Sequence, residues 1–294
     1  MNKNIEYLRP ESPMEACEVK AKYGPKARYL AGGTDLLLLW RRGGADLKYL
    51  IDLTFIDALN FMENSENILR IGTLTTLAAI EHAGPDNSPA ACLSDGARKM
   101  CTPQTRNYAT VGGNVCHASP AADMSVILVA LNAKARILGL SGEKDVPMED
   151  FFKGVNQTVL AENEMLMEIR VPVPTIKTKA SFGRVGRTGV DLAQVNTAVS
   201  LGVDDGGVVS DAAIAMGAVA PVPIRSRLAE KMLLGVEISK IDKDLMEKVS
   251  TQAASDAKPI TDIRASASYR KEMSRVLVRR SIEEITQKFA GSIS

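Results

Sequence analysis

The sequence predicts an α+β fold in which two α/β regions are followed by an α+β region. Near the start of the chain, short apolar strands alternate with helical segments. Residues 58–174 continue with further strands and helices, and the last third opens with two apolar strands around the turn residues Asp204–Gly207. The proline-containing run Val171–Ser181 is the best linker candidate. We therefore expect three regions, at residues 1–57, 58–174 and 175–294.

The first region is predicted to be a small parallel sheet with crossing helices. Ser12, Pro13 and Glu15 form a capping box with proline at the first helical position, and Gly24 supplies the stop. The leucines before Trp40 are expected in the core of a second helix. The expected elements are helix Pro13–Tyr23, strand Ala27–Leu30 running into Gly32–Gly33, a helix from Asp35 to Gly43–Gly44, and strand Leu47–Leu53.

The second region combines apolar strands with helices. Its expected strands are Ile68–Gly72, Lys134–Leu140 and Glu164–Pro174, and a further short strand runs into Gly112–Gly113. Its expected helices are Thr75–Gly84, closed by Gly84, a helix with Ser88 as its N-cap, and Ala121–Leu131. In the third region we expect an antiparallel hairpin at Leu192–Val219, followed by helices at about Leu228–Leu234, Lys243–Ala257 and Ser268–Phe289.

Two glycine pairs, Gly32–Gly33 and Gly112–Gly113, occupy similar contexts between a strand and a polar residue near a helix start. A single pair is most simply a turn, since glycine tolerates positive φ. Two pairs in matching contexts favour a different hypothesis. Consecutive backbone N–H groups next to a helix start form an anion-binding concavity, and two such loops could grip a diphosphate from both sides.

The common nucleotide motifs do not fit these loops. Neither loop matches G-x-G-x-x-G, and neither carries a P-loop lysine. Asp35 would repel a diphosphate, so we expect it to cap its helix or hold a ribose. Asp123 lies in the first turn of an apolar helix, where it either stabilises the helix dipole or accepts hydrogen bonds from ligand hydroxyls.

Composition excludes several function classes. A net charge of +1 argues against a nucleic-acid surface, and no apolar run is long enough to span a membrane. Without an apolar signal segment near the start, we expect a cytoplasmic protein. Four scattered cysteines and two histidines predict no metal site. No catalytic acid–base pair stands out, so any redox chemistry requires a bound organic cofactor.

Three segments, in order and spacing, resemble a known family: "LAGGTDLL", "RNYATVGGNVCHASPAADM" and "ENEMLMEIRVP". The family is the FAD-binding medium subunit of molybdenum hydroxylases, the group of xanthine dehydrogenase and carbon monoxide dehydrogenase. Later segments, "FGRVGRTGVDLAQVNTAVSL", "GAVAPVPIRS" and "ASASYRKEMSRVLVRRSI", resemble the C-terminal domain of the same family, so the resemblance covers essentially the whole chain.

The resemblance implies a vanillyl-alcohol-oxidase (PCMH) type FAD-binding fold of two α/β subdomains plus a C-terminal α+β domain with an antiparallel sheet. It also implies a set of FAD-binding residues in two loops, on one aspartate and on a strand that lines the flavin. These residues are Leu30, Ala31, Gly32, Gly33, Thr34, Asp35 and Leu36; Ala109, Thr110, Gly112, Gly113 and Asn114; Asp123; and Leu166 and Met167.

The resemblance further implies an electron-transfer role. The chain would receive electrons from [2Fe-2S] clusters of a small subunit, fed by molybdopterin-bound molybdenum in a large subunit, and pass them to NAD⁺ or another acceptor. Two alternatives stay open, namely a self-contained FAD oxidoreductase of the same fold and a non-redox nucleotide-binding or assembly protein. Several relatives carry a lysine near the flavin where this chain has Gly183 and Arg184.

Cys116 and His117 lie between two cofactor motifs and resemble a nucleophile pair. On one strand, adjacent side chains point to opposite faces, so we do not expect them to act together.

Overall fold

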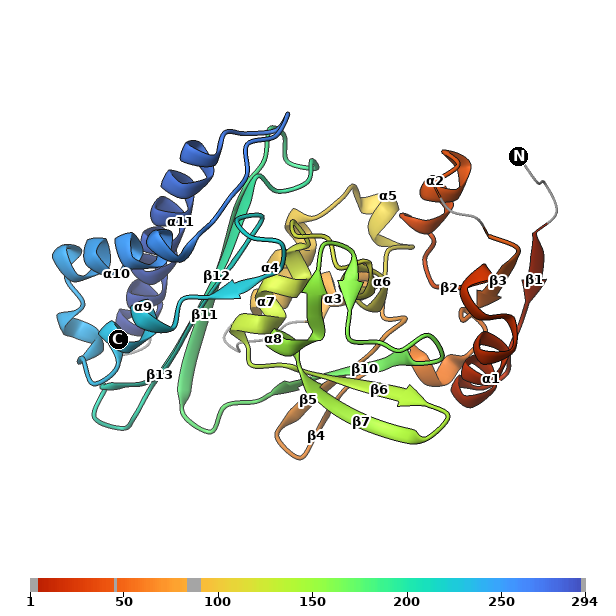
Figure 1. Cartoon of the computed structure of the whole chain (residues 1–294). Coiled ribbons are helices and arrows are strands. Elements are labelled where there is room, and N and C mark those ends of the chain that lie inside the picture. Colours follow the sequence, from red (N-terminus) through yellow and green to blue (C-terminus); the bar gives the residue numbers. More distant parts are fainter. Residues whose placement is uncertain (1–4, 45–46, 84–90, 292–294) are drawn as a thin grey trace.

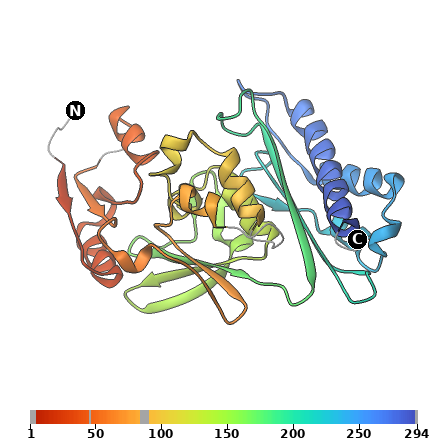
Figure 2. The same cartoon turned by 180° about the vertical axis from the view of Figure 1, so that it is seen from behind.

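The computed structural model describes residues 5–44, 47–83 and 91–291. Within these ranges the strands form three larger sheets, which follow one another along the chain and lie side by side (Figure 1). A view from behind shows the same order, with the middle sheet and its helices between the two outer parts (Figure 2). The two boundaries expected from the sequence, after residues 57 and 174, stay a prediction.

The first sheet is parallel, as predicted, with strand order β1-β3-β2. Helix α1 begins after Ser12, whose hydroxyl accepts a hydrogen bond from the backbone N–H of Glu15 at 3.2 Å, as the capping box requires. The elements are β1 (Glu6–Leu8), α1 (Pro13–Tyr23), the 3-10 helix η1 (Gly24–Lys26), β2 (Ala27–Leu30), α2 (Leu36–Arg41), β3 (Tyr49–Asp52) and η2 (Asp57–Leu59).

Helix α2 differs from the sequence prediction because its leucines are not core residues. It contains no buried residue, and Leu38 is 50% exposed. Only Leu36 and Trp40 pack against a small cluster formed by Leu30, Leu47 and Leu50. The helix stands above the first sheet, on the side that faces α5 (Figure 1).

The second sheet is antiparallel throughout, with order β4-β5-β10-β6-β7. Its strands are β4 (Met62–Ser65), β5 (Ile68–Gly72), β6 (Lys134–Gly139), β7 (Gly142–Pro147) and β10 (Met165–Pro172), and a small pair is formed by β8 (Phe152–Gly154) and β9 (Gln157–Thr158). The helices gather on one side of it: α3 (Leu77–His82), α4 (Ala91–Lys99), α5 (Pro103–Arg106), α6 (Val111–His117), α7 (Asp123–Ala130) and α8 (Met148–Phe151).

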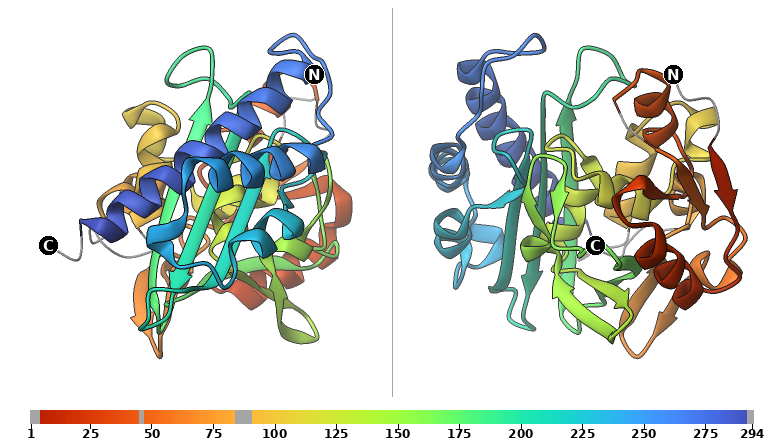
Figure 3. Two further views of the ribbon diagram at one scale, coloured as in Figure 1. Left: turned by 90° about the vertical axis from the view of Figure 1, so that its left-hand side faces the viewer. Right: turned by 45° about the vertical axis from the view of Figure 1, so that its right-hand side comes forward.

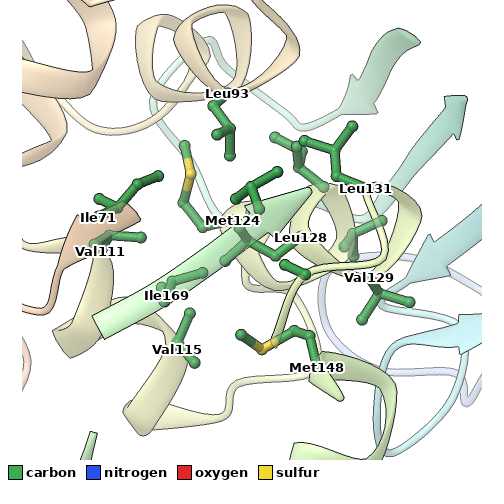
Figure 4. Packing of buried hydrophobic residues seen from close by; sticks show 14 of the residues in the cluster. Ile71, Leu93, Val111, Val115, Met124, Leu128, Val129, Leu131, Met148 and Ile169 are labelled. Atoms are coloured by element: carbon green, nitrogen blue, oxygen red, sulfur yellow. The ribbon is translucent and has the colours of Figure 1, made fainter. Parts of the chain in front are cut away.

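The core of this middle part centres on α7, all of whose residues are buried. Met124 and Leu128 of α7 lie among side chains from α4, α6 and the sheet, including Leu93, Val115 and Ile169 (Figure 4). Because α7 is apolar on every side, it must be enclosed by protein all round. The third sheet supplies the remaining cover.

The third sheet is antiparallel, with order β11-β12-β13-β14. It has helices on both faces: α9, α10 and α11 on the outer face, and α7 and α4 on the inner face (Figure 3). Its elements are β11 (Lys177–Val185), β12 (Val195–Val203), β13 (Val209–Gly217), β14 (Ile224–Arg225), α9 (Arg227–Leu233), η3 (Ile238–Lys240), α10 (Lys243–Asp256) and α11 (Ala267–Ala290). The predicted hairpin and α+β character of this region are confirmed.

Three local predictions were wrong or fall outside the structure. Gly112–Gly113 do not follow a strand but lie within α6, because Thr110 caps that helix. The linker predicted at Val171–Ser181 mostly belongs to β10 and β11, which leaves only residues 173–176 between them. Gly84 and Ser88 lie outside the described residues.

Candidate functional site

The first glycine loop, Ala31–Leu36, connects β2 to α2 and is open to solvent. Gly33 has φ of +69°, a left-handed conformation that suits glycine. Among the described residues, the backbone N–H groups of Gly32–Asp35 donate to no protein acceptor. Such a run of free N–H groups before a helix is a concavity for an anion.

Asp35 occupies the N-cap position of α2, but its carboxylate makes no capping hydrogen bond. The helix-capping role expected as one alternative is therefore not fulfilled by its side chain. An exposed carboxylate at the end of this loop is suited to accept hydrogen bonds from ribose hydroxyls.

The second glycine loop, Ala109–Asn114, is built differently. The Thr110 hydroxyl accepts from the N–H of Gly113 at 3.0 Å. The N–H groups of Val111 and Gly112 donate to the carbonyls of Thr75 and Thr73, both at 3.0 Å, and Asn114 N–H donates to the Thr110 carbonyl. The second loop therefore does not offer free N–H groups to a diphosphate, whereas the first loop does. The second loop offers instead the partly exposed Gly113, which has no side chain, and the hydroxyl proton of Thr110.

Asn114 carries an unsatisfied group in this loop. Its buried side-chain oxygen Oδ1 has no hydrogen-bond partner among the described residues. Buried acceptors are normally paired, so an orphaned one next to a ligand loop indicates a donor that the protein does not supply.

The two glycine loops touch. A Cβ at Gly32 would lie 1.7 Å from the carbonyl oxygen of Tyr108 and 3.2 Å from Cα of Ala109, so the first loop can approach the second only without a side chain. The second loop is tied in turn to β10, because Thr73 N–H donates to the carbonyl of Met167 at 2.9 Å. The structure thus brings together both loops and the backbone of Met167.

Leu166 and Met167 lie on β10 as expected, but their side chains go to different clusters. Leu166 is buried in the core beneath α6 and α7, whereas Met167 packs at the edge of the first region's cluster. Strand β10 has a register irregularity at this point, between Leu166 and Glu168.

Asp123 begins α7 and is buried. Its carboxylate faces Nε of Arg184 at 3.4 Å and accepts from Nδ2 of Asn196 at 2.5 Å. Burial raises the pKa of the Asp123 carboxyl above its ordinary value, and the Arg184 charge and the Asn196 hydrogen bond oppose that rise. Arg184 lies where several relatives carry a lysine near the flavin. In this structure its side chain is instead the ion-pair partner of Asp123.

Sequence reasoning missed the turn at Cys101, which follows α4. Cys101 follows α4 with φ of +53°, and burial raises the pKa of its thiol. The negative charges of Asp35 and Asp123 add to this rise in the pKa of the thiol. Arg106 donates to the Met100 and Cys101 carbonyls and pairs with Glu81 at 2.7 Å. No sequence signal distinguishes Cys101, although Arg106 belongs to the matched "RNYATVGGN" segment.

Cys116 and His117 lie at the end of α6 rather than on a strand, which corrects the reason given for separating them. Burial raises the pKa of the Cys116 thiol to about 12, so it is protonated near neutral pH. The described residues contain no group of three or more His, Cys, Asp or Glu side chains placed to hold a metal. No helix in the described ranges is both long and apolar enough to cross a membrane.

The fold thus packs an open loop with free N–H groups, an arrangement suited to an anion, against a second, rigid glycine loop. Residues 3–174 match the family described as FAD binding domain in molybdopterin dehydrogenase, and residues 180–285 match the CO dehydrogenase flavoprotein C-terminal domain. The chain belongs to the family of FAD-binding medium subunits of molybdenum hydroxylases. The fold class, the oxidoreductase class and the FAD cofactor predicted from the sequence are confirmed with it.

Individual relatives agree over almost their whole length. The chain is 31% identical to the glyceraldehyde dehydrogenase medium chain of Sulfolobus acidocaldarius, over 95% of this chain and 97% of that one. It is 30% identical to the nicotine 6-hydroxylase medium subunit of Paenarthrobacter nicotinovorans, over 95% and 96%. The structure of carbon monoxide dehydrogenase from Hydrogenophaga pseudoflava aligns with a TM-score of 0.91 at 30% identity, covering 97% of this chain and 98% of that one.

Proposed function

We propose that the chain is an electron-transfer subunit that binds FAD between its two glycine loops. The carrying observation is the run of free N–H groups at Gly32–Asp35, in a loop that packs against Tyr108 and Ala109 at the start of the second loop. An anionic diphosphate suits the first loop, and the orphaned Oδ1 of Asn114 suits a ligand hydroxyl or amine. The residues present therefore fit the cofactor that the family carries.

Each proposed binding residue has a distinct task. The open loop that receives the diphosphate consists of Leu30, Ala31, Gly32, Gly33, Thr34 and Leu36, and Asp35 accepts hydrogen bonds from a ribose. The rigid second loop consists of Ala109, Thr110, Gly112, Gly113 and Asn114. Asp123 accepts hydrogen bonds from the cofactor, while Leu166 and Met167 shape the strand beside it.

The partners are proposed from relatives. The chain is similar to medium chains of carbon monoxide dehydrogenase, and one related structure is described as a Cu,Mo-CO dehydrogenase. By analogy we propose a large molybdenum-cofactor subunit and a small [2Fe-2S] subunit, with the complex in the cytoplasm. When bound, FAD connects one-electron and two-electron carriers, which lets electrons from the clusters reach NAD⁺ or another acceptor. The chain's own residues bind the cofactor, orient it and exclude water from it.

The decisive experiment is an absorption spectrum of the purified chain, followed by anaerobic addition of NADH. Flavin bands that NADH bleaches would support both FAD and NAD⁺ as the acceptor. Flavin bands that NADH leaves unchanged would keep FAD and move the acceptor to oxygen, a quinone or another carrier. Absence of flavin, even after FAD is added back, would favour the non-redox nucleotide-binding alternative. Substrate turnover by the isolated chain would favour a self-contained oxidoreductase.

A further inference from the structure

A buried polar cluster joins the middle part of the molecule to the C-terminal sheet. It consists of Asp123 at the start of α7, Arg184 on β11 and Asn196 on β12. Asp123 and Asn196 are 4% and 0% exposed, and the Arg184 side chain is 9% exposed in its ion pair. The carboxylate of this cluster comes from the middle part of the chain, whereas its two partners, Arg184 and Asn196, come from the C-terminal sheet.

The position of Arg184 is fixed by backbone carbonyls. Its terminal nitrogens donate to the carbonyl oxygens of Lys99, Gly189 and Asp191. The remaining nitrogen, Nε, makes no hydrogen bond of its own and faces Asp123. A guanidinium held by three carbonyls cannot follow the carboxylate if it moves, so it defines where the charge of Asp123 is stable.

The backbone around Asp123 is locked to the same sheet. Ala218 N–H donates to the carbonyl of Pro120 at 2.6 Å, and Nδ2 of Asn196 also lies 3.4 Å from the carbonyl of Ala121. A Cβ at Gly217 would lie 2.5 Å from Cγ2 of Val126, so β13 meets α7 without room for a side chain. The segment that leads into Asp123 thus takes its shape from the ends of β12 and β13.

An unpaired carboxylate would be unfavourable at this depth. Removing one partner of a buried ion pair leaves a desolvated charge, and such a group moves or takes up a proton. Arg184 from β11 is the cation paired with Asp123. Burial raises the pKa of this carboxyl, and the charges of Arg184 and of Lys99 at the end of α4 lower it. Asn196 is the group that fixes one carboxylate oxygen by a direct hydrogen bond.

We infer that Arg184 and Asn196 are positioning residues of the flavin site, which make FAD affinity depend on the C-terminal sheet through Asp123. This inference rests on the proposed function, because it takes Asp123 as a cofactor contact. Neither residue need touch the cofactor, since both act by holding the Asp123 carboxylate ionised and in place.

The test uses the full chain, stripped of FAD, and measures the FAD dissociation constant between pH 5.5 and 8.5. In Asn196→Asp a second carboxyl would face Asp123, and two carboxyls at this distance share one proton. We expect this variant to bind FAD within about threefold of the wild-type chain at low pH and at least about tenfold more weakly at high pH, as the shared proton is lost. Arg184→Gln should also weaken binding, by about tenfold, and Arg184→Lys should restore only part of it, because an ammonium supplies the charge but not the bonds of the guanidinium to three carbonyls. Arg279→Gln is the matched control, because Arg279 lies on α11 and pairs with Glu247 of α10, away from this cluster.

The outcomes separate the inference from its premise. Circular dichroism of Asn196→Asp at both ends of the pH range shows whether the fold is intact, and each pH serves as the control for the other. A merely structural role would lower the melting temperature without a pH-dependent dissociation constant, and that result overturns the inference. If wild-type chain binds FAD and Arg184→Gln binds it equally well, the inference fails alone. If wild-type chain binds no FAD, the proposed function fails and the inference falls with it.

Discussion

The two glycine loops have similar sequences but opposite physical characters. The first loop ends in a helix without a buried residue, and its N–H groups at Gly32–Asp35 have no acceptor among the described residues. The second loop is the start of α6, with each N–H from Val111 to Asn114 hydrogen-bonded and with Gly112 pressed against Thr73. In the first loop Gly32 makes room for the Tyr108 carbonyl and Gly33 takes a left-handed conformation, while the N–H groups stay free. In the second loop Gly112 makes room for Thr73 and none of those N–H groups stays free. We therefore expect changes in the second loop to cost stability and changes in the first to cost cofactor affinity.

The largest effect is expected from Arg106→Ala, a change at the end of α5, three residues before the second loop, that removes the bonds between this side chain, α3 and the turn at Cys101. Arg106 is buried, pairs with Glu81 and donates to the carbonyls around Cys101. Losing one partner of a buried pair should lower the free energy of unfolding by about 3–5 kcal/mol. Urea denaturation followed by circular dichroism measures this loss.

Arg98→Ala is the control for this substitution, because Arg98 also faces Glu81, at 4.0 Å, but its side chain is 62% exposed. An exposed pair contributes about 0–1 kcal/mol, so this variant should be nearly as stable as the wild-type chain. Equal stability losses in the two variants would show that burial does not distinguish them.

Gly112→Ala should have the next largest effect. The added Cβ would lie 1.7 Å from the Thr73 hydroxyl oxygen and 2.6 Å from its carbonyl oxygen, so the backbone must shift. Overpacking of this kind costs about 1–3 kcal/mol in the free energy of unfolding. A melting temperature measured beside that of Gly189→Ala, where a Cβ meets nothing within 4 Å, isolates the contact. An unchanged melting temperature would mean that the second loop is as adaptable as the first.

Gly33→Ala tests the open loop. At φ of +69° an alanine is strained by about 1–2 kcal/mol, and its Cβ would press on the mobile end of Leu37. The loop can relax into solvent, so we expect a stability loss below about 1 kcal/mol and FAD binding weakened by about tenfold. Fluorescence titration of the FAD-free chain measures the affinity. A large fall in melting temperature with unchanged FAD affinity would mean that the first loop contributes to stability and not to cofactor binding.

Leu38→Lys should have the smallest effect on the isolated chain. Leu38 is 50% exposed on α2, a helix with no buried residue, and exposed substitutions away from special features change stability by about 0.5 kcal/mol or less. Chemical denaturation of the variant beside the wild-type chain tests this. A loss above about 2 kcal/mol would require α2 to be covered by protein in the isolated chain.

The sequence predicts much of this fold because its local signals agree with the tertiary structure. The capping box at Ser12–Glu15 and the turn at Asp204–Gly207 each give a boundary that the structure retains. The second glycine pair was misassigned because Thr110 and Val111 are β-formers by type, while the N-cap hydrogen bond of Thr110 and the contact with Thr73 decide in favour of a helix.

The candidate site was predictable only where its residues are close in sequence. The loop residues follow from the glycine pairs and the family resemblance, and the structure brings both loops together. The pairing of Asp123 with Arg184 and Asn196 joins residues 61 and 73 positions apart, so no local pattern could reveal it. The exposure of α2 was missed for a related reason. A run of leucines predicts a buried helix, but it does not show whether another part of the fold packs against that helix.

The order of the middle sheet has a consequence for how the chain is made. β10 lies at the centre of the sheet, between β5 and β6, yet it is the last of the five strands to leave the ribosome. Until Pro172 has emerged, β5 and β6 each lack a neighbour and expose an unpaired edge. A central strand that arrives late raises the contact order and slows folding, so nascent chains that end before β10 are the species expected to need chaperones.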